Sequence, residues 1–466
     1  MFLWQKYASS IEMQSQIAIQ ISHDKSLTWQ AVGQRINEYA FELFQQGVEQ
    51  DTGVALISKN SLELLLLYLA VIQLGGRVLL INPNTPLEKI DDLCLDNQIE
   101  FYYSPVEKKL INATALYFVE RSEKTLQSAV TIECDLLRPA TMTLTSGSTG
   151  KPKAVVHNLK AHLDNAKGVC TLMHFSKQNS WLLSLPMFHV SGQGIIWRWL
   201  YKAAQLHLPT EDFYFSVMQS SHVSLVPTQL QRLLSYLQQH RNNTFNTKGV
   251  LLGGMQISVE LTEAARKLNI ETYSGYGMTE MASTIFAKKS DDKCGVGQPL
   301  LGREFRLEGN EIWVRGAGLA MGYWQNSEIV PLTNQQGWLQ TKDLGIWQNN
   351  ELIVQGRLDN MFISGGENIQ PEQIEKVLKQ SDDVVDAFVL PIDDKEFGQR
   401  PVAMVKFKDN FSQSAVENLQ DFLQNRIERF KQPVAYFPLD TEKCQQDNVK
   451  ISRAFLKKEL KFLLGK

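Results

Sequence analysis

The spacing of apolar residues divides the first part of the chain into alternating helices and strands. Apolar side chains recur at helical spacing in Leu27–Gly47, which predicts an amphipathic helix. Gly53–Ser58 and Val78–Ile81 are short apolar runs that predict buried strands, and Ser61–Leu74 predicts a helix that two glycines end. Strand and helix continue to alternate to about residue 300. This order predicts parallel sheets covered by helices.

After Gly302 the pattern changes to short β segments, which predict a small barrel-like β unit over about residues 302–356. A domain boundary is expected near Gly356–Asp359, where the pattern changes again. The segments beyond it alternate as helix, strand, strand and helix: Pro371–Leu378, Val384–Pro391, Val402–Phe407 and Ser414–Arg429. We therefore predict a large domain over residues 1–356, which includes the β unit, and a separate small α+β domain over residues 357–466.

A chain of 466 residues is too long for one compact core, so two or more domains are expected. Its net charge of −3 argues against a general nucleic-acid-binding protein, which would carry a basic excess. The five cysteines are scattered and predict neither a disulfide framework nor a metal site. No export signal is recognisable, and the most apolar segment, Leu64–Ile72, is shorter than the roughly 20 residues of a membrane span. We expect a cytosolic protein that does not insert into membranes.

The segment Thr145–Lys153 has the sequence Thr-Ser-Gly-Ser-Thr-Gly-Lys-Pro-Lys and lies between strand-like runs at Ala140–Leu144 and Ala154–Val156. Its small and hydroxyl-bearing residues let the backbone approach an anion closely, and two lysines add positive charge. This chemistry suits the β- and γ-phosphates of a nucleotide. The segment is not a Walker A loop, since Thr145 stands where that motif has glycine and Pro152 where it has a hydroxyl. The alternative is a surface turn rich in glycine and serine.

A second candidate cluster runs from Ser274 to Glu280, Ser-Gly-Tyr-Gly-Met-Thr-Glu. Its glycines leave Tyr276 able to lie flat as a stacking surface for adenine, and Thr279 can donate to a phosphate oxygen. Glu280 offers the hard oxygen ligand that Mg²⁺ prefers. By itself, the cluster is also compatible with a glycine-rich turn followed by a helix-capping glutamate.

Asp343 and Arg357 are expected at the ends of two strands. A carboxylate in that position can accept hydrogen bonds from both ribose hydroxyls of a nucleotide. The alternative is an ordinary Asp–Arg surface pair, which would contribute at most about 1 kcal/mol to stability.

These segments occur in the order that is typical of the adenylate-forming superfamily of acyl-CoA synthetases, adenylation domains and luciferases, which the chain resembles from about Leu27 to Leu460. The resemblance is carried by Thr145–Lys153, Tyr276–Glu280, the strand with Asp343, Gly356–Asp359, Ser364–Pro371 and Lys450–Arg453. Within the superfamily, the chain is similar to the o-succinylbenzoate–CoA ligases of menaquinone biosynthesis in Leu185–Gly194, Trp197–Trp199 and Val226–Leu230. The implied fold is α/β, with a large N-terminal domain of helix-covered sheets plus a small β unit, and a small mobile α+β C-terminal domain.

The resemblance implies an AMP-forming acid–CoA ligase that uses ATP, Mg²⁺ and CoA. A carboxylate attacks the α-phosphorus of ATP, giving acyl-AMP and pyrophosphate, and the CoA thiol then displaces AMP. By analogy, Glu280 anchors Mg²⁺ beside Thr279, and Lys450 bridges the carboxylate and the α-phosphate, where preorganised charge is typically worth about 10²–10³ in rate. The other implied nucleotide contacts are Thr145, Ser146, Gly147, Ser148, Thr149, Gly150, Lys153, Gly254, Ser274, Gly275, Tyr276, Asp343 and Arg357.

The small domain is expected to serve both half-reactions. Val449 stands where the superfamily usually has glycine, but the spacing from Lys450 to Arg453 is intact. Gly365 and Gly366 belong to a loop that lines the pantetheine tunnel in the superfamily. Because this loop and Lys450 cannot face one site in a single orientation, the resemblance implies rotation about a hinge at Asp359. His189 would be an aromatic gate between the adenylate and the thiol.

The predicted acid substrate places a demand on the acid pocket. o-Succinylbenzoate has a second carboxylate, whose burial without a partner would cost several kcal/mol. Arg232 is the first candidate partner, with Ser191 and Gln193 as neutral donors and Arg198 and His222 in reserve. Three alternatives stay open: a CoA ligase for another aryl or medium-chain acid, an adenylation enzyme that loads a carrier protein, and a nucleotide-binding regulatory protein without catalysis. A homo-oligomer is possible.

Overall fold

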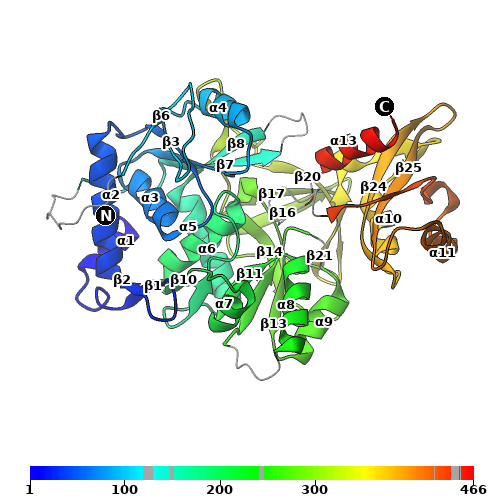
Figure 1. Ribbon diagram of the computed structural model, residues 1–466, viewed down its shortest axis with the longest axis horizontal. Coiled ribbons are helices and arrows are strands. Elements are labelled where there is room, and N and C mark those ends of the chain that lie inside the picture. Colours follow the sequence, from blue (N-terminus) through cyan, green and yellow to red (C-terminus); the bar gives the residue numbers. More distant parts are fainter. Residues whose placement is uncertain are drawn as a thin grey trace. The chain divides into compact units, whose positions relative to one another are not determined.

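The computed structural model describes residues 1–118, 130–146, 152–240, 246–255, 257–424, 426–441, 451 and 453–465. The chain forms two compact units (Figure 1). The first unit consists of Met1–Phe305 and Val314–Leu339, and the second of Arg306–Trp313 and Gln340–Lys466.

Two large sheets form the first unit within the described residues. The strand order of the nine-stranded sheet is β15 (Gln298–Pro299), β14 (Ser283–Lys289), β13 (Glu271–Met278), β12 (Gly249–Leu252), β11 (His222–Leu225), β9 (Ser180–Leu182), β10 (Gln205–His207), β1 (Ile17–Gln20) and β2 (Ser26–Thr28). The order of the eight-stranded sheet is β19 (Glu328–Val330), β18 (Gly322–Gln325), β8 (Pro152–Asn158), β7 (Pro139–Ser146), β4 (Arg77–Ile81), β3 (Gly53–Ile57), β5 (Phe101–Tyr103) and β6 (Thr114–Ala115).

Helices of the first unit cover both sheets. Those in the main core are α1 (Leu3–Ser9), α2 (Trp29–Gln45), α3 (Leu62–Gln73), α5 (Leu159–Leu172) and α6 (Val190–Lys202). Three helices pack on the other face of the nine-stranded sheet: α7 (Phe213–Gln219), α8 (Pro227–Gln239) and α9 (Val259–Lys267). Helix α4 (Leu87–Asp96) packs on the other face of the eight-stranded sheet. The main core contains strand residues from both sheets, so its helices lie between them.

Both sheets are parallel in their middle; the eight-stranded sheet is antiparallel at one margin, and the nine-stranded sheet at both, since β1 and β2 also pair antiparallel. β3, β4 and β7 run parallel to one another, whereas β7, β8, β18 and β19 are joined by antiparallel pairing. Likewise β11, β12 and β13 are parallel, and β13, β14 and β15 are antiparallel. Antiparallel neighbours can be joined by a tight turn. The margins therefore supply the short connections on which the candidate site is built.

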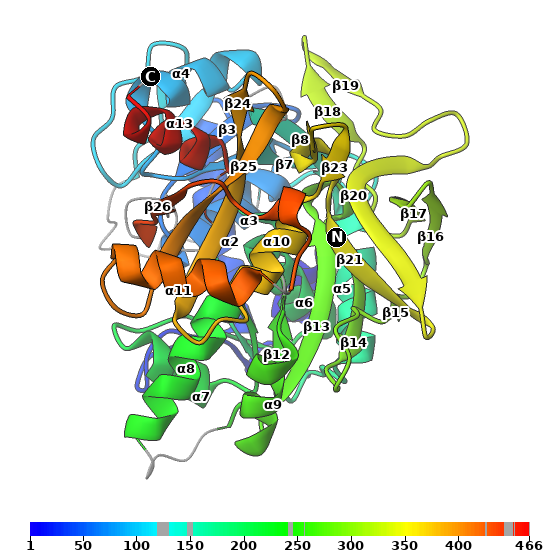
Figure 2. The ribbon, with the colours of Figure 1, turned by 90° about the vertical axis from the view of Figure 1, so that its right-hand side faces the viewer.

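The second unit has two smaller sheets. One has the order β16 (Arg303–Glu308), β17 (Glu311–Gly316), β20 (Leu339–Gln348) and β21 (Glu351–Arg357), and the first residues of β16 and the last of β17 belong to the first unit. The other has the order β23 (Glu367–Ile369), β22 (Phe362–Ser364), β25 (Gly398–Phe407) and β24 (Val384–Asp394), with β26 (Tyr436–Pro438) beside β25. Helices α10 (Pro371–Leu378) and α11 (Gln413–Leu423) pack on one face of this sheet, and α13 (Arg453–Leu463) packs on the other (Figure 2).

The predicted order of helices and strands and the α/β fold class are confirmed. One predicted helix is too long: α11 ends at Leu423, not at Arg429. Ile427 and Phe430 nevertheless pack against the same core from a segment that contains the 3₁₀ turn η3 (Arg429–Lys431), which explains why their spacing looked helical. Within the described residues, no helix is long and apolar enough to cross a bilayer. The domain boundary between residues 356 and 357 stays a prediction.

Trp29, at the start of α2, stacks on Trp199 of α6 with 5.0 Å between ring centroids, and both side chains are fully buried. We expect Trp29→Ala to lower the free energy of unfolding by about 3–5 kcal/mol, because it removes a large buried ring and leaves a cavity. Phe44→Ala, in the same helix at a half-exposed position, is the control and should change it by less than about 1 kcal/mol. Urea denaturation followed by circular dichroism measures both. Equal losses in the two variants would contradict the packing described for α2.

Candidate active site

The predicted phosphate loop connects two antiparallel strands of the first unit. β7 and β8 pair up to Thr145, which lies opposite Lys153, and Ser146, which lies opposite Pro152. This confirms the predicted strands on both sides of the loop. Gly147, Ser148, Thr149 and Gly150 lie outside the described residues, as does the side chain of Ser146. Thr145 and Lys153 are therefore the described members of this group, and both are half-buried at the base of the hairpin.

The second predicted cluster forms a tight turn between β13 and β14. Gly277 is required there, because a Cβ atom in its place would lie 2.0 Å from the carbonyl oxygen of Ser283. After the 3₁₀ turn η1 (Thr279–Met281), Ala282 and Ser283 have φ angles of 52° and 118°, which side-chain-bearing residues rarely adopt. Strained backbone of this kind is concentrated at functional sites.

The predicted nucleotide contacts lie along β13 and its neighbours. Tyr276 is half-buried, with its ring centroid 6.2 Å from that of Phe286. Ser274 is buried, and its hydroxyl lies 2.8 Å from the Ser290 hydroxyl. Gly275 lies between them in β13, and Gly254 follows β12 with a φ of +80°. β12 and β13 are parallel and adjacent, so these residues are near the carboxyl ends of two neighbouring strands.

Glu280 is 7% exposed, and its Oε1 accepts a hydrogen bond of 2.7 Å from the Tyr323 hydroxyl. Tyr323 comes from β18, and Lys153 Nζ lies 5.1 Å from the centroid of its ring. Among the described residues no group of three or more His, Cys, Asp or Glu side chains could hold a metal. A single buried carboxylate still fits Mg²⁺, because this ion commonly binds one or two carboxylates together with phosphates and water.

Side chains that follow the phosphate loop hold the main chain around Glu280. His157 of β8 is fully buried, and its Nε2 lies 2.8 Å from the Thr279 carbonyl oxygen. Asn165 of α5 donates to the carbonyl oxygens of Met281 and Thr284, each at 3.0 Å. Burial lowers the pKa of His157 to about 4, so at neutral pH its imidazole is uncharged. Its Nε2 must then carry the proton, because a carbonyl can only accept.

Helix α6 carries several predicted acid-site residues. His189 immediately precedes the helix and is half-buried, with its ring centroid 4.8 Å from that of Phe188. Ser191 is half-buried as well. Gln193 is fully buried, and its amide nitrogen donates to the Thr143 hydroxyl and to the Met187 carbonyl oxygen. Both amide hydrogens of Gln193 are therefore used within the protein, and its amide oxygen is buried without a hydrogen-bond partner among the described residues.

The three other predicted acid-site candidates differ in burial. Arg232 is exposed on α8, next to Tyr214. His222 is buried, between the Ser221 hydroxyl at 2.9 Å and the Met173 carbonyl oxygen at 3.3 Å. Arg198 is 1% exposed and lies over the Trp181 ring, and its Nη1 donates to the Ser224 hydroxyl at 3.3 Å. Burial lowers the pKa of the Arg198 guanidinium to about 10, so it stays charged at neutral pH.

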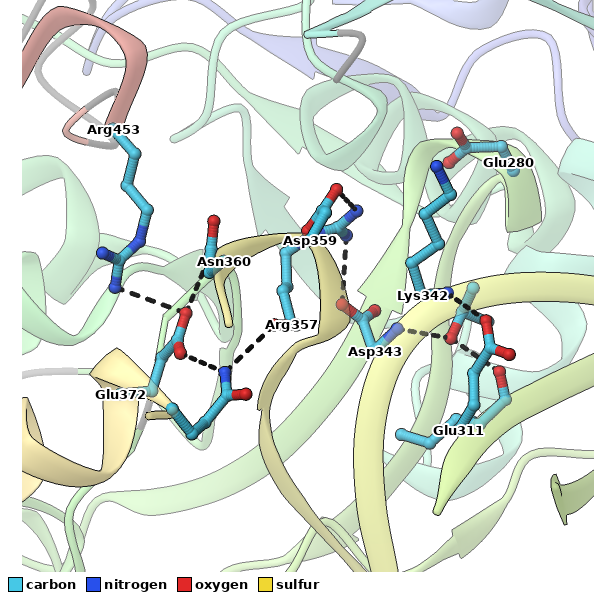
Figure 3. A network of polar contacts seen from close by, with 12 residues as sticks. Glu280, Glu311, Lys342, Asp343, Arg357, Asp359, Asn360, Glu372 and Arg453 are labelled. Atoms are coloured by element: carbon cyan, nitrogen blue, oxygen red, sulfur yellow. Dashed lines mark hydrogen bonds and ion pairs between the residues drawn. The ribbon is translucent and has the colours of Figure 1, made fainter. Parts of the chain in front are cut away.

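In the second unit, Asp343 of β20 and Arg357 of β21 are direct cross-strand partners (Figure 3). Arg357 Nη1 donates to Asp343 Oδ1 at 3.0 Å, and its Nε and Nη2 donate to the two oxygens of Asp359 at 2.8 and 3.0 Å. Partial burial raises the pKa of Asp359, but the hydrogen bond and charge of Arg357 outweigh this and lower it. The arginine thus joins the predicted ribose carboxylate to the predicted hinge residue.

The same unit carries the predicted CoA and adenylation residues. Gly365 and Gly366 form the turn between β22 and β23 with φ angles of +59° and +86°. Lys450 lies outside the described residues. Arg453 donates to Glu375 Oε1 at 2.5 Å and to the Val389 carbonyl oxygen at 2.9 Å. It also lies 3.3 Å from Glu372 Oε1, and Figure 3 shows Glu372 between Arg453 and Asn360.

Comparison with known proteins identifies the family. Residues 8–324 match the AMP-binding enzyme family, and residues 373–443 match the AMP-binding enzyme C-terminal domain. The chain belongs to the AMP-binding enzyme family.

Relatives of this family are similar over nearly the whole chain. The 2-succinylbenzoate–CoA ligase of Haemophilus influenzae is 57% identical over 97% of this chain and 97% of its own length. A variant of Escherichia coli MenE with bound OSB-AMS has a TM-score of 0.88 and 39% identity, covering 98% of each chain. The o-succinylbenzoate coenzyme A synthetase (MenE) of Bacillus subtilis, in complex with ATP and magnesium ion, has a TM-score of 0.82 and 26% identity, covering 94% of this chain and 95% of that one. The predicted resemblance to adenylate-forming enzymes, and to o-succinylbenzoate–CoA ligases among them, is confirmed.

Sequence reasoning missed three residues of this family member's site: Tyr323, His157 and Asn165. Tyr323 follows a glycine in a short β run and has no neighbouring motif that marks it. His157 lies in the strand that follows the phosphate loop and Asn165 in the next helix, so their position was a usable signal. A lone histidine within an apolar run is, however, usually a packed core residue.

We expect the stability of this family member to decrease as the pH falls from 6.5 to 4. The ordinary pKa of histidine is 6.5, and that of His157 in the folded protein is about 4, so in this range the unfolded chain binds a proton that the folded protein does not. His157 alone should reduce the free energy of unfolding by up to about 3 kcal/mol. His157→Gln can still donate to the Thr279 carbonyl but cannot titrate, so its stability should depend less steeply on pH.

Urea denaturation at several pH values between about 7 and 5 measures this dependence. His162 is also buried with a lowered pKa, and its ring centroid lies 5.0 Å from that of His157, so part of the dependence should persist in the variant. His23→Gln, at an exposed position, is the control. A dependence as steep in His157→Gln as in the wild type would contradict the buried, uncharged state of His157.

Proposed function

We propose that this protein joins o-succinylbenzoate to CoA in two steps, through o-succinylbenzoyl-AMP, with release of pyrophosphate and then of AMP. The observation that carries the proposal is the similarity to the Haemophilus influenzae 2-succinylbenzoate–CoA ligase along almost the full length of both chains. The product would be o-succinylbenzoyl-CoA, an intermediate of menaquinone biosynthesis. A cytosolic location and a homo-oligomer stay predictions.

In the first step, a carboxylate must approach a polyanionic nucleotide, so the protein has to neutralise negative charge. We assign the outgoing pyrophosphate to the β7–β8 loop with Thr145 and Lys153 at its base. Glu280 would hold Mg²⁺, which would neutralise charge on the phosphates. Tyr276 would stack on adenine, and Thr279 would donate to a phosphate oxygen. Lys450 is the predicted cation at the attacking oxygen.

The second unit would bind the ribose of the nucleotide and would line the path of the CoA pantetheine arm. Asp343 would accept the ribose hydroxyls while Arg357 neutralises part of its charge. The bidentate contact of Arg357 with Asp359 places a cation next to the predicted hinge. Gly365 and Gly366 would allow the pantetheine arm to pass close to the main chain, since neither presents a side chain.

We propose Arg198, and not the first candidate Arg232, as the partner of the second carboxylate. Arg198 is buried with its charge, and among the described residues no carboxylate forms an ion pair with it. A buried unpaired charge costs several kcal/mol, so an anionic substrate group would stabilise it. Arg232 is exposed and already solvated, and its charge would contribute much less.

We expect Arg198→Met to raise the KM for o-succinylbenzoate by about tenfold or more, with little change in the KM for ATP, because it removes a buried charge from the acid pocket. The variant should also lose the wild-type preference for o-succinylbenzoate over 4-oxo-4-phenylbutanoate, which lacks the ring carboxylate. Arg232→Met is the matched variant and should keep both properties. The opposite result for the two arginines would move the second carboxylate to Arg232.

With ATP, Mg²⁺, CoA and o-succinylbenzoate, the protein should release AMP and pyrophosphate and form the thioester, as measured by chromatography of nucleotides and thioesters. Without CoA it should still exchange labelled pyrophosphate into ATP when the acid is present. Formation of ADP would contradict the mechanism. Turnover of benzoate or fatty acids alone, or transfer to a carrier protein and not to CoA, would favour the alternative ligase or the loading enzyme. Nucleotide binding without exchange would indicate the regulatory protein.

A further inference from the structure

We infer that Tyr323 is a positioning residue for the metal-binding carboxylate of Glu280. The hydroxyl of Tyr323 holds one oxygen of that carboxylate, and its ring keeps Lys153 apart from it. The inference rests on the proposed function, since it concerns how the enzyme binds ATP together with Mg²⁺. It assigns a role in the reaction to a residue outside both of the predicted nucleotide-binding clusters.

Strand pairing places Tyr323 next to the phosphate loop. β18 pairs antiparallel with β8, with Tyr323 opposite Val155. Lys153 is two residues from Val155, so its side chain lies on the same face of the sheet and diagonally across from Tyr323. At this spacing a long side chain can reach across the pair, and the lysine ammonium accordingly lies over the tyrosine ring. The position of Tyr323 is therefore set by the same strand that leaves the phosphate loop.

The main chain at Glu280 is fixed independently of Tyr323. His157 and Asn165 hold the carbonyl groups of Thr279, Met281 and Thr284, and the Ala320 amide donates to the Glu280 carbonyl oxygen at 2.9 Å. The remaining freedom is in the glutamate side chain, which has several rotatable bonds. The hydrogen bond from Tyr323 restricts it, because it fixes Oε1. The other carboxylate oxygen accepts no hydrogen bond from the described residues and is directed by the same restraint.

The tyrosine also separates two opposite charges. Lys153 and Glu280 form no ion pair with each other, although each contacts Tyr323, one at the ring and one at the hydroxyl. A direct Lys153–Glu280 ion pair would satisfy both groups with each other, and both would bind phosphate and metal less well. The ring face attracts the ammonium, and the hydroxyl donates to the carboxylate. Tyr323 thus keeps the ammonium for phosphate oxygens and the carboxylate for the metal.

Tyr323→Phe tests this, because it removes the hydroxyl and keeps the ring beneath Lys153. Binding of Mn²⁺ to the enzyme–ATP complex, without acid substrate, is measured by electron paramagnetic resonance of unbound Mn²⁺. We expect the Mn²⁺ midpoint to rise about tenfold, since a hydrogen bond to a charged group is lost. The affinity for AMP without metal, measured by calorimetry, and the thermal unfolding temperature should remain those of the wild type.

Tyr236→Phe is the matched control, because the Tyr236 hydroxyl donates to the Asp212 carboxylate at 2.8 Å, away from the turn at Glu280. It should leave the Mn²⁺ midpoint unchanged. In a Glu280→Gln background, Tyr323→Phe should have little further effect on that midpoint. An unchanged midpoint in Tyr323→Phe alone, or equal weakening of Mn²⁺ and AMP binding together with a lower unfolding temperature, would overturn the inference. If the wild type showed neither Mn²⁺-dependent ATP binding nor pyrophosphate exchange, the proposed function would fail, and the inference with it.

Discussion

The buried hydrogen bonds from His157 and Asn165 to the β13–β14 turn are the constraint on which the rest of the site depends. They join the two large sheets at the point where each has an antiparallel margin. One margin carries the phosphate loop and the other carries Glu280. Without these bonds, carbonyl groups of a strained turn would be buried and unpaired, which costs about 1–3 kcal/mol for each group. The position of the β13–β14 turn relative to β8 and α5 is therefore fixed by buried side chains that lie outside both predicted nucleotide-binding clusters.

Two buried charged groups of the first unit, Arg198 and Glu280, lack a full counter-charge among the described residues. Arg198 is buried without a carboxylate partner among the described residues, whereas Glu280 is satisfied on one side by a neutral hydroxyl. Such burial costs free energy unless a bound ligand of opposite charge compensates the group. In the second unit, one guanidinium, that of Arg357, is shared between two carboxylates, Asp343 and Asp359. Its single positive charge neutralises only part of the negative charge of the pair.

Much of the fold could be predicted from the sequence because its signals are local. The two strands beside the predicted phosphate loop and the helix Pro371–Leu378 were found from short runs of residues and agree with the structure. Tyr323 could not be found in this way, because its contact with Glu280 joins positions 43 residues apart and depends on which strand lies beside β8. Arg198 was named only as a reserve, since burial, which distinguishes it from Arg232, cannot be derived from a helix pattern with polar residues on several faces. The length of α11 was overestimated because a non-helical segment packs against the same core.

The anchoring of Arg453 to α10 also ties the start of α13 to the rest of the second unit. Ile451 is buried in the core beneath α13, and Arg453 is held by Glu375 and Val389, so positions on the C-terminal side of Lys450 are secured to the second unit. If Lys450 acts as predicted, it can reach the α-phosphate only while the whole second unit is in the orientation for adenylation. The turnover rate would then depend on how long the second unit stays in each orientation.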